Sequence, residues 1–379
     1  MKTRWTRLVT LVLAASPAWA ACEDDTNGAG ETTPSEVTTP ADTEDDADSA
    51  PSGDTAPGPT ETIVVETAVM DTVATDTIAT DTADTAAEVE VRESTDAAVL
   101  AGLKTRTIDG TDILADLYLP AGVGPFAAVI VIHGGGFVAG ARDGKSETTW
   151  AEYLQSNQFA AFSIDYRLGG DLAGPSWDAQ LGDAKCAVMW LRQHAPEYRI
   201  DPDRLFVFGS SAGGWFSDML AVTGDEAAYT PSCSETGGGV SNRVAGAISY
   251  FGPSNFLTIL GERLANDPTY DENKSELGGL LGNRCKTEAD RLGVCTTASP
   301  ALQVDADDAP VFLLHSDDDP VVPVQQSADM RAALIAAGVA VDYREVTGLA
   351  HGWHAKFNDA QAIAARDAVL AWLRTHAGY

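Results

Sequence analysis

The fold is decided by one stretch, Arg204-Leu-Phe-Val-Phe-Gly-Ser-Ser-Ala-Gly-Gly214, in which an apolar strand, a tight turn and a helix follow one another directly. The turn has the pattern G-x-S-x-G, in which the glycines permit a sharp, strained bend that exposes the central serine hydroxyl above a sheet. The helix expected over 212–222 also offers N-terminal amides to a developing oxyanion. We therefore predict that Ser211 is a nucleophile and that Ser210 fills the turn.

Strand and helix patterns alternate on either side of this stretch. Strands are expected over 113–119, 127–132, 159–164, 204–208, 244–250, 310–314 and 341–346, and helices over 146–155, 177–194, 212–222, 325–337 and 360–376. The run 127–132 is apolar throughout, which is typical of a buried parallel strand. The alternation predicts an α/β fold, with a mostly parallel central sheet and helices on both faces. Residues 254–305 are polar and Gly-rich and break the alternation, so this small insertion is a candidate lid or part of a substrate pocket.

A second Gly-rich loop, His133-Gly-Gly-Gly-Phe137, follows the strand that ends at Ile132. Functional loops gather at the carboxyl ends of parallel strands. Glycines let the backbone approach a substrate carbonyl with its amides turned inward, as in the HGGG-type oxyanion loop. The alternative is a generic Gly-rich connection.

An acid and a histidine complete the expected chemistry, because a serine hydroxyl needs a base and the base needs a carboxylate to orient it. Asp319 lies after the strand over 310–314, and His351 lies after the strand over 341–346. His354 competes with His351 as the base. Asp317 and Asp318 compete with Asp319 as the acid. A cluster of three acids in a loop is also often only solvated.

The N-terminus has the pattern of an export signal over 1–21, with basic residues before a short apolar run and Ala18-Trp-Ala20 as a cleavage site. Cys22 follows directly and resembles the lipidated cysteine of a bacterial lipoprotein. The alternative is ordinary cleavage, in which Cys22 is incidental. We expect an exported protein, either anchored to the membrane at the cell envelope through a lipidated Cys22 or secreted.

Residues 22–97 predict a disordered, acidic, Thr-rich linker. From residue 23 onward it contains 21 acidic residues against one basic residue, Arg92, and no aromatic residue. Such a segment cannot bury enough apolar surface to fold. A calcium-collecting tract is a weaker interpretation, because single spaced carboxylates make a poor oxygen cage.

The formal charge of the whole chain is −32. Residues 98–379, the expected folded domain, contain 35 acidic and 20 basic residues. Without a basic surface to neutralise phosphates, nucleic acid is not expected as a partner. The folded part contains four cysteines, of which Cys285 and Cys295 are the favoured disulfide pair, and Cys186 could be a buried apolar residue. We expect no metal, because no Cys/His cluster has ligand spacing, and the sequence does not indicate an oligomeric state.

Residues from about 100 to 379 resemble the bacterial feruloyl/acetyl-xylan esterase (BD-FAE-like) and carboxylesterase group of α/β-hydrolases, close to the hormone-sensitive-lipase-like esterases. The resemblance is carried by IHGGGFVAG (132–140), DYRL (165–168), DAKCAVMWLR (183–192), FGSSAGG (208–214), HSDDDPVVPVQQS (315–327) and the Ala350–Gly352 segment. The group's acid loop has the pattern His-Gly-x-x-Asp, which selects Asp319, although Ser316 replaces the glycine here.

The resemblance implies an α/β-hydrolase fold and a serine carboxylic-ester hydrolase that needs no cofactor. It implies Ser211 as nucleophile, His351 as base, Asp319 as acid, and Gly135, Gly136 and Ala212 as oxyanion-hole donors. The expected substrates are short-acyl or aromatic-acyl esters, either small molecules or linked to plant polysaccharide. The alternatives are an amidase or peptidase with the same triad, and a non-catalytic surface lipoprotein of this fold that binds a ligand.

Overall fold

The structure, a computed structural model, describes residues 95–169, 176–266 and 291–379, all of which belong to the compact unit Asp76–Tyr379. The expected export signal, Cys22 and almost all of the expected linker lie outside the described residues. These expectations therefore stay predictions. So does the division into signal, linker and domain.

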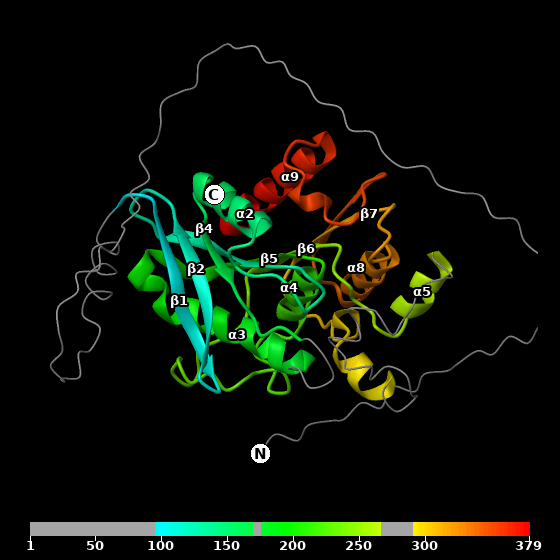
Figure 1. Cartoon of the computed structure of the whole chain (residues 1–379), viewed down its shortest axis with the longest axis horizontal. Coiled ribbons are helices and arrows are strands. Elements are labelled where there is room, and N and C mark those ends of the chain that lie inside the picture. Colours follow the sequence, from blue (N-terminus) through cyan, green and yellow to red (C-terminus); the bar gives the residue numbers. More distant parts are fainter. Residues whose placement is uncertain (1–94, 170–175, 267–290) are drawn as a thin grey trace, which may run out of the picture. The chain divides into compact units, whose positions relative to one another are not determined.

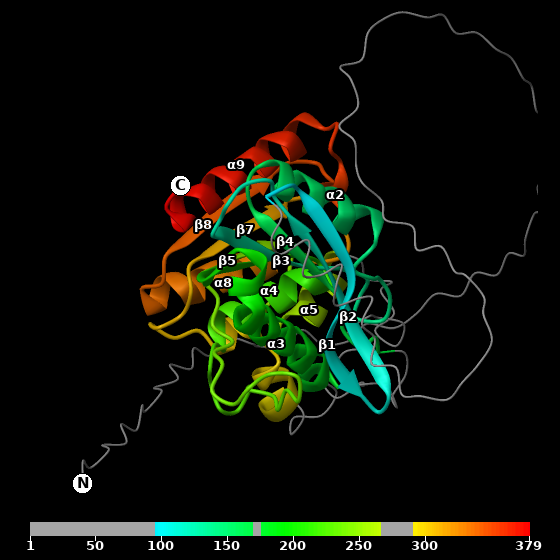
Figure 2. The same cartoon turned by 90° about the vertical axis from the view of Figure 1, so that its left-hand side faces the viewer.

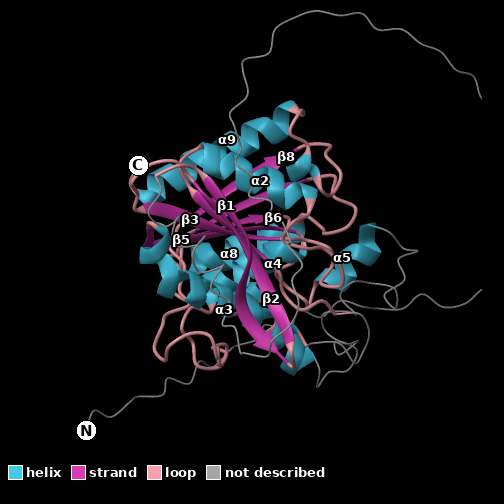
Figure 3. Ribbon diagram, turned by 60° about the vertical axis from the view of Figure 1, so that its left-hand side comes forward, coloured by secondary structure: helices cyan, strands magenta, loops and turns pink. Residues whose placement is uncertain are grey.

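One eight-stranded sheet forms the centre of the described unit, with the order β1-β2-β4-β3-β5-β6-β7-β8. The strands are β1 (Ala98–Ile108), β2 (Thr111–Leu119), β3 (Phe126–Ile132), β4 (Ala160–Ile164), β5 (Ile200–Ser210), β6 (Gly246–Tyr250), β7 (Val311–Ser316) and β8 (Val341–Val346). All pairs from β4 to β8 are parallel, whereas β1–β2 and β2–β4 are antiparallel. The mostly parallel sheet is therefore confirmed, and Figure 3 shows its twist among the helices.

Helices cover both faces of the sheet, as the alternating pattern predicts. They are α2 (Lys145–Ser156), α3 (Trp177–His194), α4 (Ala212–Val222), α5 (Ile259–Asn266), α8 (Gln325–Ala337) and α9 (Ala360–Ala377). Short helical turns cover Ala195–Tyr198, Arg291–Cys295, Pro300–Leu302 and Trp353–Ala355. Helices α2 and α9 pack on one face, and α3, α4 and α8 pack on the other (Figures 1 and 2).

The central strand β3 shows why the sheet needs both layers. All seven of its residues are buried. Ala128, Ile130 and Ile132 face the core beneath α3 and α4, whereas the alternate residues Val129 and Val131 face the core beneath α2 and α9. Successive strand side chains point to opposite faces, so a run that is apolar throughout requires cover on both sides. Because β3, β5, β7 and β8 run parallel, the loops that follow them lie at the same edge of the sheet.

Most expected strands are found within one or two residues of their expected ends, whereas β1 and β5 differ more. Strand β1 was not predicted as a separate element, because only Leu103 and Thr105 of its eleven residues are buried. It is an edge strand that pairs with β2 alone and has register shifts, so its side-chain pattern is weak. Strand β5 begins at Ile200, before Pro202, and a register shift lies between its pairing at Ile200 and its pairing from Leu205.

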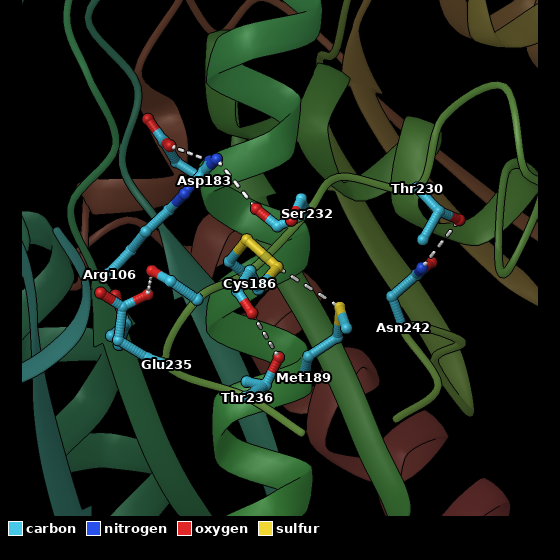
Figure 4. Close-up of a disulfide and its surroundings, with 12 residues drawn as sticks. Arg106, Asp183, Cys186, Met189, Thr230, Ser232, Glu235, Thr236 and Asn242 are labelled. Atoms are coloured by element: carbon cyan, nitrogen blue, oxygen red, sulfur yellow. Dashed lines mark hydrogen bonds and ion pairs between the residues drawn. A yellow bond between two sulfur atoms is a disulfide. The ribbon is translucent and has the colours of Figure 1, made fainter. Parts of the chain in front are cut away.

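A disulfide joins Cys186 of α3 to Cys233, with a Cα–Cα distance of 5.6 Å. Cys186 is therefore not simply a buried apolar residue. Figure 4 shows the bond beside Asp183 and Arg106. The segment that contains Cys233 is also held by a hydrogen bond of 3.2 Å from Arg106 Nη2 to the Ser232 carbonyl oxygen. Cys295 is also disulfide-bonded, but Cys285 lies outside the described residues, so the pairing of these two cysteines stays a prediction.

The described ends of the insertion over 254–305 are fastened to the domain. Gln326 Oε1 of α8 accepts hydrogen bonds from the amides of Ser254 and Asn255, at 2.9 and 2.8 Å. Trp215 Nε1 of α4 donates to the Ala298 carbonyl oxygen at 2.8 Å. Residues 267–290 are not described, so a lid at this position stays a prediction.

Candidate active site

Ser211 stands at the sharp turn between β5 and α4. Its φ of 57° lies in the left-handed region, which is strained for a residue with a side chain. A Cβ added to Gly209 would lie 2.1 Å from the Gly213 carbonyl oxygen, and one added to Gly213 would lie 2.1 Å from the Ile132 carbonyl oxygen. The backbone segments therefore approach so closely that only glycine fits on either side. The Ser211 amide donates to the Tyr250 carbonyl oxygen at 2.9 Å, which ties the turn to β6.

Ser211, His351 and Asp319 form one chain of hydrogen bonds. His351 Nδ1 lies 2.7 Å from Asp319 Oδ2, and His351 Nε2 lies 3.0 Å from Ser211 Oγ. An ionised carboxylate can only accept, so Nδ1–H donates to Asp319 and Nε2 accepts from the serine hydroxyl. The three residues expected from the sequence therefore lie in the arrangement that a nucleophile, a base and an orienting acid require.

The loop after β7 holds Asp319 as a carboxylate. Burial alone would raise its pKa, but hydrogen bonding to His351, the nearby His351 charge and the amides of Val322 and Val321 together lower the pKa of Asp319 below its ordinary value. Both amides donate to Oδ1, at 2.9 and 2.8 Å respectively. Oδ2 therefore remains available to His351.

His315 and Ser316 support the same loop. His315 is fully buried, and its ring hydrogen-bonds to Ser327 Oγ at 2.7 Å and to the Val322 carbonyl oxygen at 2.9 Å. Ser316, which departs from the family's glycine, accepts a hydrogen bond on Oγ from the Leu349 amide at 3.0 Å. This hydroxyl thus links the acid loop to the loop that carries His351, so the departure adds a contact between the two.

The competing residues take other positions. Asp317 and Asp318 are exposed, and Asp317 Oδ1 accepts from the Gly348 amide at 2.9 Å. His354 Nε2 lies 2.9 Å from Ser146 Oγ of α2. Burial and the neighbouring His351 charge lower the pKa of His354 to about 3, which leaves it a poor base. The geometry therefore favours Asp319 and His351 within the described part of the chain.

The Gly-rich loop after β3 runs directly beside the nucleophile. A Cβ added to Gly134 would lie 3.5 Å from Ser211 Cβ. Gly135 and Gly136 have φ values of +105° and +60°, which side chains rarely adopt. Their amides and that of Ala212, the first residue of α4, donate no hydrogen bond within the described residues. Unpaired amides on two sides of a serine are what an oxyanion hole requires.

Arg142 anchors the far end of this loop and was not singled out by the sequence. Its guanidinium pairs with Asp116 at 2.9 Å and with Asp165 at 2.7 Å, and its amide donates to Asp165 Oδ1 at 2.8 Å. Asp165 belongs to the DYRL segment, in which Arg167 pairs with the fully buried Asp183 of α3 at 2.7 Å. The sequence does show these charged residues next to apolar strands. It does not show which arginine pairs with which acid, because the partners are distant in the sequence.

No group of three or more His, Cys, Asp or Glu side chains among the described residues is placed to hold a metal ion. None of the helices in that part of the chain combines the length and apolar character needed to cross a membrane.

Comparison with known proteins agrees with this architecture. Residues 115–334 match the family model BD-FAE. LipM of Mycobacterium tuberculosis, a probable carboxylic ester hydrolase, is 26% identical over 52% of this chain and 42% of its own length. The chain thus spans less than half of that relative.

Two solved structures share the fold. A truncated carbohydrate esterase from gut microbiota superimposes with a TM-score of 0.61 at 23% identity, over 76% of this chain and 99% of its own. An acetyl ester-xyloside bifunctional hydrolase from Caldicellulosiruptor lactoaceticus gives 0.59 at 22% identity, over 70% and 89%. The expected fold is therefore confirmed, and the chain belongs to the BD-FAE family of α/β-hydrolases.

Proposed function

We propose that this chain is a serine carboxylic-ester hydrolase that acts through an acyl-enzyme on Ser211. The observation that carries the proposal is the position of His351, whose two ring nitrogens lie 3.0 Å from Ser211 Oγ and 2.7 Å from Asp319 Oδ2. The BD-FAE match and the carboxylic ester hydrolase among its relatives support the same reaction class.

The reaction follows from this geometry. His351 Nε2 removes the Ser211 proton as Oγ attacks the ester carbonyl, and Asp319 stabilises the imidazolium that results. The amides of Gly135, Gly136 and Ala212 receive the negative charge of the tetrahedral intermediate. The imidazolium then protonates the leaving alcohol. Water, deprotonated by His351, attacks the acyl-enzyme, and the acid is released with Ser211 restored.

The finer proposal is that the acyl group is short or aromatic and that the alcohol is small or part of a plant glycan. It is supported by two structural neighbours, the carbohydrate esterase and the acetyl ester-xyloside hydrolase. These substrate classes are properties of the neighbours, and we propose them for this chain. We further propose export through residues 1–21, with or without lipidation of Cys22. Mass spectrometry of the mature N-terminus tests this, since a diacylglyceryl-modified Cys22 and an unmodified cleaved terminus differ in mass.

Hydrolysis of p-nitrophenyl acetate and butyrate by the full chain tests the reaction. The parent should be active, whereas Ser211→Ala should be lower by roughly 10⁴-fold or more, because the nucleophile is absent. Ser210→Ala is the matched control, since it removes a neighbouring hydroxyl that lies outside the triad. A folded parent that neither hydrolyses these esters nor reacts covalently at Ser211 with a fluorophosphonate would contradict the proposal.

A further inference from the structure

Phe137 holds an unusual backbone position beside the predicted oxyanion donors. Its φ is +69°, directly after Gly135 at +105° and Gly136 at +60°. A bulky residue with positive φ is a genuine outlier, and its backbone is strained. Such a conformation persists only when the surrounding structure holds it in place. The contacts of Phe137 therefore identify what keeps the Gly-rich loop in shape.

The ring of Phe137 and its carbonyl oxygen are held by different helices. The ring is buried and packs edge-on against Trp215 of α4, with the ring centroids 5.4 Å apart. The carbonyl oxygen accepts a hydrogen bond of 2.8 Å from the Gly169 amide and one of 3.0 Å from Gln180 Nε2 of α3. The Gly-rich loop is thus fixed to the nucleophile's own helix and, through one amide side chain, to α3.

Gln180 is an unusual residue for a helix interior. It is fully buried, and its Nε2 also donates to the Arg167 carbonyl oxygen at 2.8 Å, while its Oε1 has no partner within the described residues. A buried oxygen without a hydrogen bond is destabilising, and an apolar side chain of the same shape would avoid that cost. As far as the described residues show, stability alone therefore gives little reason for an amide at this position, whereas its Nε2 donates to carbonyl oxygens of two loops beside the site.

We propose that Gln180 is a positioning residue for the oxyanion hole. Its side-chain amide fixes the Phe137 carbonyl group. This contact keeps the backbone N–H groups of Gly135 and Gly136 directed at the substrate oxygen that becomes negative during the attack. The inference rests on the proposed ester hydrolysis. Gln180 itself touches no reacting atom. Since oxyanion donors act only when charge develops, a displaced loop lowers kcat and leaves the binding of the neutral ester nearly unchanged.

The first experiment uses the full chain with Gln180→Met, which keeps the length of the side chain and removes both donors. We expect kcat for p-nitrophenyl acetate to fall roughly 10- to 100-fold, as for a small misplacement of a reacting group, with little change in KM. Inhibition by a trifluoromethyl ketone, whose adduct carries the same oxyanion, should weaken in proportion to kcat. The pH dependence of the remaining activity should keep the parent's midpoint.

Gln193→Met is the matched control on the same helix. Gln193 is exposed, and its Oε1 accepts a hydrogen bond of 2.7 Å from the Gly237 amide, so the substitution removes a comparable contact away from the loop. It should leave kcat unchanged. If Gln180→Met also stays within twofold of the parent in kcat and in ketone affinity, the positioning role is overturned.

Gln180→Glu gives a second measurement that does not depend on the stability of the first variant. The introduced carboxyl group, when ionised, would set negative oxygens against two carbonyl oxygens, whereas its protonated form regains one donor. Burial favours the protonated form, so the kcat of this variant relative to the parent should rise as the pH falls. A ratio that stays near one at every pH contradicts the proposal, because a purely structural glutamine predicts no recovery.

Hydrogen exchange of residues 133–140 separates this inference from the proposed function. Exchange should increase in Gln180→Met and not in Gln193→Met, whether or not the protein hydrolyses esters. If the parent proves inactive but Gln180→Met still exchanges faster, the contact of Gln180 with the loop is retained and the proposed esterase function is rejected. Unchanged exchange with an active parent would remove the positioning role alone.

Discussion

The two sides of the candidate site are held by different kinds of interaction. On the oxyanion side, the Gly-rich loop and α3 are fastened by the partly buried ion pairs of Arg142, by those of the buried Asp183 and by the Cys186–Cys233 disulfide. On the acid–base side, the described contacts of the loops after β7 and β8 are made by the neutral side chains of His315 and His354 and by the Asp317 carboxylate.

The difference follows from what His351 has to do. During the reaction it gains a proton, and a fixed cation nearby would disfavour that step. Burial lowers the pKa of His315 to about 4, and burial with the His351 charge lowers that of His354 to about 3, so both are neutral at pH 7. Asp319 then stays the dominant charge beside His351. The oxyanion side acts through backbone amides, and its ion pairs meet no such restriction.

The largest expected effect comes from Asp183, which is fully buried and accepts hydrogen bonds from Arg106 Nη1 and Arg167 Nε, both at 2.7 Å. Asp183→Ala would leave two guanidinium groups without their partner. We expect a loss of about 3–5 kcal/mol in the free energy of unfolding, measured by urea denaturation. Asp112→Ala, which removes the exposed partner of Lys104, should cost at most about 1 kcal/mol. Equal losses in the two variants would mean that the buried pairs do not fasten this side.

The disulfide should come next in size. It closes a segment with a sequence separation of 47 residues, and loop closure of this length is worth roughly 4 kcal/mol. The double variant Cys186→Ala, Cys233→Ala should therefore lower the midpoint of thermal unfolding but keep the parent's kcat at 25 °C, because neither cysteine belongs to the triad or to the Gly-rich loop. A selective loss of kcat at unchanged stability would show that the disulfide positions the site instead.

The sequence predicted what depends on short-range pattern. The strand-turn-helix around Ser211 and the apolar strand β3 were recognised because glycine spacing and apolar runs are local properties. The ends of α3, α4, α8 and β8 agree with the expected ranges for the same reason. The order of the three loops predicted Ser211 and His351, with His354 as a competitor. Asp319 was preferred to Asp317 and Asp318 only through the resemblance to the family's acid loop.

What the sequence did not reveal depends on tertiary distance. The pairing of Cys186 with Cys233 requires two Cα atoms 5.6 Å apart, which sequence separation cannot indicate. Gln180 looks like an ordinary polar residue beside an apolar helix stripe until its two carbonyl partners are seen. His315 could be taken as no more than the start of the acid loop, because its contact with Ser327 depends on how α8 packs against β7.

A substitution of His315 tests how the acid–base side is held. His315→Leu would leave Ser327 Oγ and the Val322 carbonyl oxygen without this partner, so we expect a loss of about 2 kcal/mol in the free energy of unfolding. Since the Val322 amide holds Asp319, kcat should fall as well. His376→Leu on α9 is the control, because it removes a 2.9 Å hydrogen bond to the Trp372 carbonyl oxygen far from the acid loop. A fall in stability with full kcat would restrict His315 to a packing role.

The smallest effect concerns Asp218, a buried residue of α4, the helix that begins directly after Ser211. The single hydroxyl hydrogen of Ser249 has two acceptors within reach, the Gly214 carbonyl oxygen at 3.2 Å and Asp218 Oδ2 at 3.0 Å. Both contacts are satisfied when Asp218 is protonated and donates to Ser249. Burial, opposed only in part by the Ser249 hydrogen bond, raises the pKa of Asp218 to about 8.

The sign of the pH effect follows from that protonation. The folded state keeps the Asp218 proton from the ordinary carboxyl range near pH 4 up to about pH 8, whereas the unfolded state loses it. The group's contribution to stability is therefore complete below pH 4 and declines as the pH rises to about 8. Asp218→Asn keeps the shape and cannot ionise, so its stability relative to the parent should rise by about 1 kcal/mol from pH 6 to pH 7, measured by urea denaturation. If the free energies of unfolding of the two proteins change with pH in parallel, Asp218 is already ionised in the folded state. The helix that follows Ser211 would then contain a buried charge, as the oxyanion side does.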